Sequence, residues 1–166
     1  MTNAPDGGAP KNAGVIAPPP LMLLAALLAG FGLDHVQPLG VLDEAPQSAR
    51  WIAGGVLIGF ALAINFQGFF RFQRAGTPVR PWMGTKKLVT DGVYAHVRNP
   101  MYLGMALIAF GLGAIFAGDW LVICGALFWL ALHYGVVRRE ESYLEKLFGE
   151  EYRQYKKRVP PYGWRF

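Results

Sequence analysis

Four apolar stretches, separated by polar segments, dominate the chain. They cover Leu21–Leu33, Trp51–Phe66, Met101–Ala117 and Trp120–Val137, and each is nearly free of charge. With their neutral flanks, these stretches approach the roughly 20 residues that a helix needs to cross a bilayer. The pattern predicts an all-α integral membrane protein with about four transmembrane helices, near residues 18–36, 50–70, 101–117 and 120–137.

A different pattern follows the last apolar stretch. Between residues 138 and 158, apolar and aromatic side chains such as Tyr143, Leu147 and Phe148 share one side of a helix, and charged residues lie largely elsewhere. Gly149 is suited to end one helix before a second begins. We expect an amphipathic helical tail over 138–158, within a single domain over 18–166. Residues 1–17, rich in Ala, Gly, Pro and Asn, are expected to be disordered.

The first apolar stretch has two interpretations. Pro18-Pro19-Pro20 suits the start of a helix, because a proline in the first turn removes only a donor that has no partner within the helix. The alternative is a cleaved signal peptide with Lys11 as its positive region. The proline run and the lack of an A-x-A site argue against that alternative.

The second apolar stretch carries small residues at a helical spacing. Gly55 and Gly59 are four residues apart and therefore lie on one face of the helix. Such a pair lets another membrane helix approach closely, so we interpret it as a packing surface.

The distribution of charge predicts the orientation in the membrane. The loop between the second and third stretches and the tail after Val137 are both rich in Lys and Arg. The loop from Asp34 to Ala49 has three carboxylates and no Lys or Arg. Basic segments next to membrane helices remain on the cytoplasmic side, so both termini are expected to be cytoplasmic.

Composition also argues against several functions. The formal net charge is +5, but the basic residues lie beside apolar spans, which favours anionic lipid headgroups over nucleic acid as their partner. Cys124 is the only cysteine, and the three histidines have no ligand spacing, so we expect no metal site. The oligomeric state is not indicated by the sequence.

Two polar segments border the last two spans. The first, residues 86–104, reads KKLVTDGVYAHVRNPMYLG, and the second, residues 138–160, reads RREESYLEKLFGEEYRQYKKRVP. Together they resemble the isoprenylcysteine carboxyl methyltransferase family, which is related to the phospholipid methyltransferases. The matching residues are Leu88, Val89, Gly92, Tyr94, Arg98, Pro100, Tyr102, Gly104, Glu140, Glu141, Phe148, Gly149, Tyr152 and Tyr155. The resemblance covers roughly the C-terminal half and is of the bacterial type, which implies a bacterial inner membrane.

The resemblance implies a cofactor, S-adenosylmethionine, and a set of residues that bind it. These residues are Lys86, Lys87, Leu88, Val89, Tyr94, Arg98, Asn99, Pro100, Met101, Tyr102, Glu140 and Glu141. It also implies that Arg138, Arg139 and Glu141 are catalytic, because family members that methylate a carboxylate have an arginine shortly before the glutamate. Val137 stands where such an arginine would lie four residues before Glu141, so the substrate is not fixed by the resemblance.

The chemistry of the side chains agrees with this cofactor. Arg98 or amides of the loop suit its carboxylate, Glu140 or Glu141 suits its ammonium or ribose, and tyrosine rings suit the face of its adenine. Asn99 replaces a histidine found in eukaryotic members, and an amide cannot take up a proton near neutral pH. His96 is then the nearest candidate base.

We therefore predict an enzyme that methylates a hydrophobic or lipid-like acceptor at the cytoplasmic face of the membrane. A carboxylate of an isoprenoid or prenylcysteine, a phospholipid amine and a thiol all remain open as acceptors. The alternatives are a thiol S-methyltransferase of the same fold and a non-catalytic membrane protein whose basic tail binds lipid.

Overall fold

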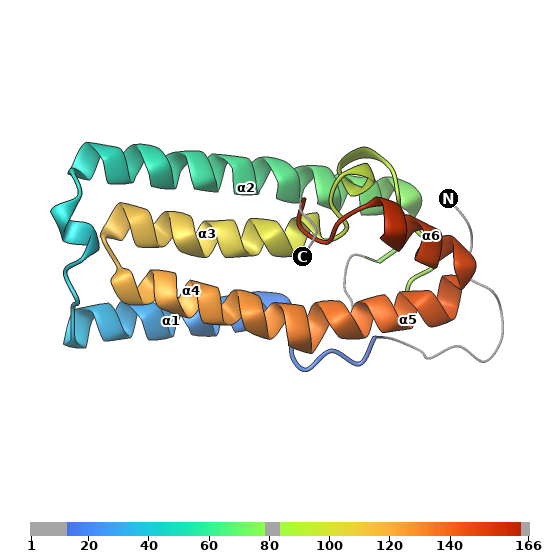
Figure 1. The fold of residues 1–166 in the computed structure, drawn as a ribbon, viewed down its shortest axis with the longest axis horizontal. Helices are drawn as coiled ribbons and strands as arrows, with labels where there is room; N and C mark the ends of the chain where they lie inside the picture. Colours follow the sequence, from blue (N-terminus) through green and yellow to red (C-terminus); the bar gives the residue numbers. More distant parts are fainter. Residues whose placement is uncertain (1–12, 79–83, 164–166) are drawn as a thin grey trace. The chain divides into compact units, whose positions relative to one another are not determined.

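The computed structural model describes residues 13–78 and 84–163, and these residues form helices joined by loops (Figure 1). The helices are α1 (Pro19–Val36), α2 (Gln47–Ala75), α3 (Pro100–Phe116), α4 (Asp119–Leu132), α5 (Arg138–Phe148) and α6 (Glu150–Arg158). Two 3-10 turns (Leu42–Glu44 and Gly92–Ala95) and a π-helical turn (His133–Val137) complete the described elements. The predicted all-α fold is confirmed. The predicted disorder of residues 1–17 falls mostly on residues 1–12, which lie outside the described residues.

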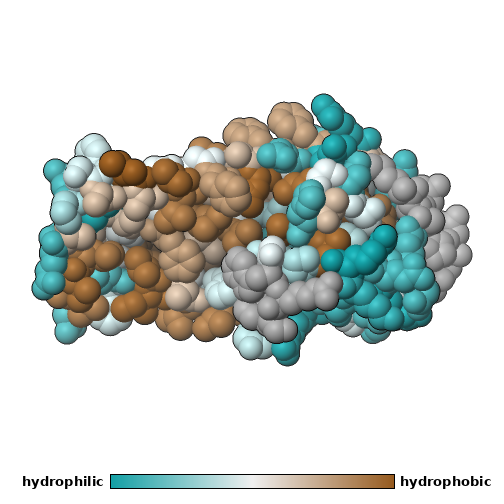
Figure 2. Space-filling model, turned by 45° about the horizontal axis from the view of Figure 1, so that its top comes forward, coloured by the Kyte–Doolittle hydropathy of each residue, from teal (hydrophilic) through white to brown (hydrophobic). Residues whose placement is uncertain are grey.

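Three described helical segments are long and apolar enough to cross a membrane. They are Pro19–Val36, Gln47–Ala75 and the continuous helix Asp119–Phe148, and the apolar helix Pro100–Phe116 is shorter, at 17 residues. Figure 2 shows a broad hydrophobic surface over the spans and hydrophilic residues gathered elsewhere. The chain is an integral membrane protein, as predicted.

The chain folds into two compact units whose segments alternate along the sequence. The first, here called the membrane unit, contains Pro18–Ala63 and Tyr102–Leu132. The second, here called the tail unit, contains Ile64–Met101 and His133–Phe166 together with Met1–Ala17, as far as these ranges are described. The predicted single domain over residues 18–166 stays a prediction.

Glycines bring helices close together in the membrane unit. A Cβ atom added to Gly30 of α1 would lie 2.8 Å from the Cα of Leu121 in α4, and one added to Gly54 of α2 would lie 2.5 Å from the carbonyl oxygen of Gly111 in α3. Added Cβ atoms at Gly55 and Gly59 would meet nothing within 4 Å. Among the described residues of this chain, Gly55 and Gly59 therefore lack the predicted packing role, because the face of α2 that contacts α3 carries Gly54.

Two aspartates tie the ends of helices to their neighbours in the membrane unit. The carboxylate of Asp34 accepts hydrogen bonds from the backbone N–H groups of Trp120 and Leu121, at 3.0 and 3.1 Å. These groups belong to the first turn of α4, where backbone donors have no partner within the helix. Asp119 accepts in turn from Val41 and Leu42, at 2.9 and 3.1 Å.

The tail unit is built around the amphipathic helices α5 and α6. Gly149 separates them with φ +55°, a backbone conformation that favours glycine. Their inner faces form a hydrophobic core together with Leu88 from the segment before α3. The buried residues of this core are Leu88, Tyr143, Leu147, Phe148, Tyr152, Tyr155 and Val159. The predicted amphipathic tail is thus confirmed, with Tyr143, Leu147 and Phe148 on its buried side.

Candidate functional site

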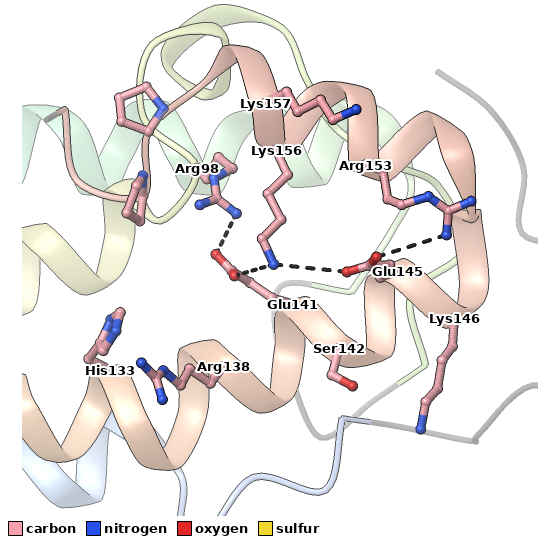
Figure 3. Close-up of a pocket in the computed structure, with 12 residues that line it drawn as sticks. Arg98, His133, Arg138, Glu141, Ser142, Glu145, Lys146, Arg153, Lys156 and Lys157 are labelled. Atoms are coloured by element: carbon pink, nitrogen blue, oxygen red, sulfur yellow. Dashed lines mark hydrogen bonds and ion pairs between the residues drawn. The ribbon is translucent and has the colours of Figure 1, made fainter. Parts of the chain in front are cut away.

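A cleft of about 1100 Å³ lies in the tail unit (Figure 3). Its lining residues come from the segment before α3, the π-helical turn, α5, α6 and the two prolines after α6: Arg98, His133, Arg138, Glu141, Ser142, Glu145, Lys146, Arg153, Lys156, Lys157, Pro160 and Pro161. The lining combines several basic side chains with two carboxylates. Such a cleft suits a polar ligand that carries charges of both signs.

Glu141 of α5 is paired with two cations from different segments. The guanidinium of Arg98 donates to one carboxylate oxygen, and the ammonium of Lys156 lies 3.1 Å from the other. The side chains of Arg98 and Glu141 are only 8% and 14% exposed. Water screens the attraction between these two side chains only weakly. Removing either partner would leave the other charge partly buried and poorly solvated, which is destabilising.

Further charges attach α6 to α5 around this pair. Lys156 and Arg153 each lie 3.9 Å from Glu145, and Arg153 also donates to Glu150 at 2.7 Å. The hydrogen bond from Arg153, with the positive charge of the same residue, lowers the pKa of Glu150. These groups are well exposed, so they orient α6 more than they stabilise the fold.

The segment after α6 holds Arg98 in position. The backbone N–H of Arg98 donates to the carbonyl of Pro160 at 3.0 Å, and that of Asn99 donates to the carbonyl of Pro161 at 3.1 Å. The side-chain amide of Asn99 donates to the same carbonyl of Pro161, at 3.3 Å. Tyr162 follows directly, is 1% exposed, and its hydroxyl lies 3.1 Å from His133 Nδ1.

The tyrosines of the tail unit are core residues. The hydroxyl of Tyr155 donates to the carbonyl of Tyr94 at 2.7 Å, and both rings are buried. Burial, and secondarily the charge of Glu140, raises the pKa of Tyr94. Burial likewise raises the pKa of Tyr152, with a further contribution from the charge of Glu141. These phenols therefore remain neutral at physiological pH.

The structure brings together part of the predicted site. Arg98, Arg138 and Glu141 all line the cleft. Arg139 instead lines a smaller neighbouring pocket, where its guanidinium donates to the carbonyl of Gly14 at 2.9 Å. Among the described residues no tyrosine lines the cleft, so the expected stacking of a tyrosine on adenine has no support there.

The remaining predicted cofactor residues have other contacts, and their role stays a prediction. The backbone N–H groups of Lys86 and Lys87 donate to the buried hydroxyl of Thr77, at 2.9 and 3.4 Å. Leu88, Val89 and Pro100 are buried. Glu140 and Met101 are half-buried in the tail unit, and Tyr102 is buried at the start of α3, in the membrane unit.

Sequence reasoning missed several residues that line the cleft. Lys156 belongs to the basic tail that the sequence predicts, and it lies four residues after Tyr152, so it shares a helix face with a core residue. The sequence gives no signal for His133, because the three histidines have no ligand spacing. His96, the predicted candidate base, is exposed and is not among the lining residues.

The chain is similar to known methyltransferases over part of its length. The chain is 41% identical over 76 residues to the protein-S-isoprenylcysteine O-methyltransferase of Schizosaccharomyces pombe and 39% identical over 79 residues to that of Homo sapiens. The matches cover 44% and 46% of this chain but only 31% and 27% of those relatives, so the chain matches about a third of their length.

A solved structure shares the fold. It is the eukaryotic intramembrane Ras methyltransferase, isoprenylcysteine carboxyl methyltransferase, with a TM-score of 0.51 at 21% sequence identity. The similarity covers 86% of this chain and 50% of that one. The profile of the phospholipid methyltransferase family matches residues 49–151, which is more than half of the chain. The resemblance predicted from the sequence is confirmed, and the chain belongs to the phospholipid methyltransferase family.

Proposed function

We propose that this protein transfers a methyl group from S-adenosylmethionine to a hydrophobic or lipid-like acceptor at the cytoplasmic face of the membrane. The observation that carries the proposal is the pairing of Glu141 with Arg98 and Lys156 on the wall of the cleft. Membership of a methyltransferase family supports the reaction type.

The residues of the cleft fit the polar end of this cofactor. The buried Nε of Arg98 has no hydrogen-bond partner among the described residues, so this side chain has a donor to offer to a carboxylate. Glu141 and Glu145 offer acceptors to an ammonium or to ribose hydroxyls. The cleft volume is also at the scale of small-molecule sites, which is about 300 to 1,000 Å³.

Binding would exchange one set of ion pairs for another. Arg98 would turn from Glu141 to the carboxylate of the ligand, and Glu141 would accept from its ammonium in place of a protein cation. The charged groups of the cleft would then stay paired throughout, which avoids the cost of leaving an unpaired charge in a partly buried site.

Catalysis would consist mainly of positioning. The bound cofactor supplies an electrophilic methyl group on a positively charged sulfur. Arg138 lines the same cleft and would hold an anionic acceptor beside that methyl group. A carboxylate acceptor needs no general base, whereas a thiol or amine would have to give up a proton, and His133 is the imidazole that lines the cleft.

The names of the relatives favour a carboxylate acceptor of the prenylcysteine type. An apolar acceptor of this kind would reach the site from the lipid. The basic side chains Arg71, Lys86, Arg98, Arg138 and Lys156 all belong to the tail unit. We therefore place this unit, with both termini, on the cytoplasmic side.

The test compares two glutamates of the tail unit. Glu141→Gln removes the charge at the centre of the cleft, and the control Glu150→Gln removes an exposed charge that does not line it. We expect calorimetry on the purified, folded protein to show that Glu141→Gln weakens S-adenosylmethionine binding by about a hundredfold, since a charged hydrogen-bonded partner is lost. The control should bind within about twofold of the wild type.

A labelled-methyl assay on membranes that contain the protein then identifies the acceptor. Label in extracted isoprenoid acids or prenylated protein supports a carboxylate acceptor, label in phospholipid supports an amine, and label in the volatile fraction supports a thiol. Absence of cofactor binding to the intact wild-type protein would refute the proposed function and favour a non-catalytic role.

A further inference from the structure

A second pocket borders the cleft on helix α5. It has a volume of about 420 Å³ and is lined by Ala13, Gly14, Arg138, Arg139, Ser142, Tyr143 and Lys146. We call it the basic pocket. Its α5 residues Arg139, Ser142 and Lys146 follow one another at spacings of three and four, so they share one face of the helix. In Figure 3, Ser142 and Lys146 point away from α6.

The charge of the basic pocket differs from that of the cleft. Its three cations, Arg138, Arg139 and Lys146, are accompanied by no carboxylate among the lining residues. In the described part of the chain, no ion pair joins any of the three to an acidic side chain. The lining of the cleft, by contrast, includes the carboxylates of Glu141 and Glu145 as well as cations. A ligand for the basic pocket should therefore be an anion rather than a zwitterion.

Two of these cations are already oriented by the protein. The guanidinium of Arg139 donates to the carbonyl of Gly14, at 2.9 Å. The guanidinium of Arg138 lies over the ring of Tyr134, 4.6 Å from its centre. Ordering these side chains before a ligand arrives reduces the entropy that binding must overcome.

The position along the chain indicates where the anion comes from. The basic pocket begins directly after the apolar helix α4 and the π-helical turn, within a segment long and apolar enough to span a membrane. Tyr134 in that turn is 57% exposed, and exposed tyrosines at the end of a span are typical of the headgroup level of a bilayer.

We propose that the basic pocket binds the phosphate of an anionic phospholipid headgroup. Guanidinium groups match phosphate oxygens with paired hydrogen bonds, and Lys146 and the hydroxyl of Ser142 add further donors. The basic pocket shares Arg138, Ser142 and Lys146 with the cleft, whereas Arg139 and Gly14 line the basic pocket and not the cleft. Binding of a headgroup there does not depend on the proposed reaction. It would fix α5, and with it one wall of the cleft, against the surface of the membrane.

The experiment titrates the purified full-length chain in a neutral detergent with short-chain phosphatidic acid and with short-chain phosphatidylcholine, and records binding by calorimetry. We expect the anionic lipid to bind more tightly by at least about tenfold. Arg139→Gln should weaken the binding of phosphatidic acid about fivefold, and the double variant Arg139→Gln/Lys146→Gln should weaken it again by a similar factor. Each basic residue near an anionic headgroup strengthens lipid binding by about this factor. Arg139→Lys keeps the charge and should retain most of the affinity.

Arg74→Gln serves as the matched control, because Arg74 is an exposed cation of α2 outside the basic pocket. An equal loss of affinity in Arg74→Gln, or no loss in the double variant, would overturn the site. Inorganic phosphate is titrated in parallel, and binding as tight as that of phosphatidic acid would overturn the assignment to a lipid. Unfolding temperatures measured without lipid confirm that each variant is folded.

Discussion

The membrane unit and the tail unit both hold carboxylates away from water, but they pair them with different groups. In the membrane unit, Asp34 and Asp119 accept hydrogen bonds from backbone N–H groups. In the tail unit, Glu141 is held by the side chains of Arg98 and Lys156, on the wall of a cleft. Backbone donors at a helix end have no alternative partner, whereas side-chain cations can turn to a ligand. The first pairing fixes structure, and the second is suited to binding.

The two units also fill their interiors differently. The membrane unit uses glycines such as Gly30 and Gly54, which let helix backbones approach each other. The tail unit uses buried tyrosines, including Tyr152 and Tyr155, whose hydroxyl groups require partners. Close packing without polar groups suits helices in lipid, while the tail unit needs a polar interior beside its charged cleft.

The largest expected effect comes from breaking the pair in the tail unit. Arg98→Met leaves Glu141 partly buried beside the ammonium of Lys156 alone, and we expect a loss of about 3 kcal/mol in the free energy of unfolding. Cofactor binding should be lost as well. Denaturant unfolding in detergent measures the first effect and calorimetry the second.

The double variant Arg98→Met/Glu141→Met separates stability from binding. Two apolar side chains of suitable size often replace a buried ion pair at little cost, so we expect the double variant to recover most of the stability and none of the cofactor binding. If the double variant bound the cofactor, the functional role of the pair would be refuted.

The next effect tests the close packing of the membrane unit at two adjacent glycines of α2. Gly54→Ala places a methyl group against the backbone of Gly111, so we expect it to cost about 1 to 3 kcal/mol. Gly55→Ala meets nothing within 4 Å, and alanine is the better helix former, so it should be neutral or slightly stabilising. Equal unfolding temperatures for the two variants would contradict the packing of α2 on α3.

A smaller effect is expected at the carboxylate that holds the start of α4. Asp34→Ala removes the acceptor of two backbone N–H groups, and the loss of such a cap costs about 1 to 2 kcal/mol. Cofactor affinity should not change, because Asp34 is not among the residues that line the cleft. Glu44→Ala is the control, since Glu44 is an exposed acid of the same unit. A fall in affinity without a fall in stability would argue against a purely structural role for Asp34.

Much of the fold could be predicted because local patterns determine it. Hydrophobic runs of near bilayer length give the spans, and Gly149 between two amphipathic stretches gives the break between α5 and α6. The packing face of α2 could not be predicted, because adjacent glycines such as Gly54 and Gly55 look alike until the partner helix is placed. The hydrogen bonds that Asp119 accepts could not be predicted either, because their donors, the backbone N–H groups of Val41 and Leu42, lie far away in sequence.

Residues of the candidate site could be predicted only where the spacing of residues within one sequence segment matched the family pattern. The pattern around Arg98, Arg138 and Glu141 located three of the residues that line the cleft. The ion pair between Lys156 and Glu141 depends on how α6 folds back on α5 after Gly149, and the sequence does not specify this. Arg138 and Arg139 are neighbours in sequence, yet consecutive residues on a helix point in different directions, and only Arg138 lines the cleft.

The smallest expected effect concerns a buried phenol of the tail unit. Tyr155→Phe removes the hydrogen bond to the carbonyl of Tyr94, which should cost about 1 kcal/mol near neutral pH. Burial raises the pKa of Tyr155 in the folded protein, while the same phenol in the unfolded chain ionises near its ordinary pKa of about 10. Above about pH 10 the unfolded state therefore binds fewer protons than the folded state, and the contribution of Tyr155 to stability falls as pH rises.

Phenylalanine has no proton to lose, so the stability difference between the wild type and Tyr155→Phe should shrink as the pH is raised past about 10. Tyr134→Phe is the matched control, because Tyr134 is exposed and its hydroxyl is not held in the core. Thermal unfolding in detergent at a series of pH values measures both variants. A difference that stays constant with pH for Tyr155→Phe would mean that this phenol ionises as easily in the fold as in the unfolded chain. The tail unit would then have a wetter interior than its buried tyrosines imply.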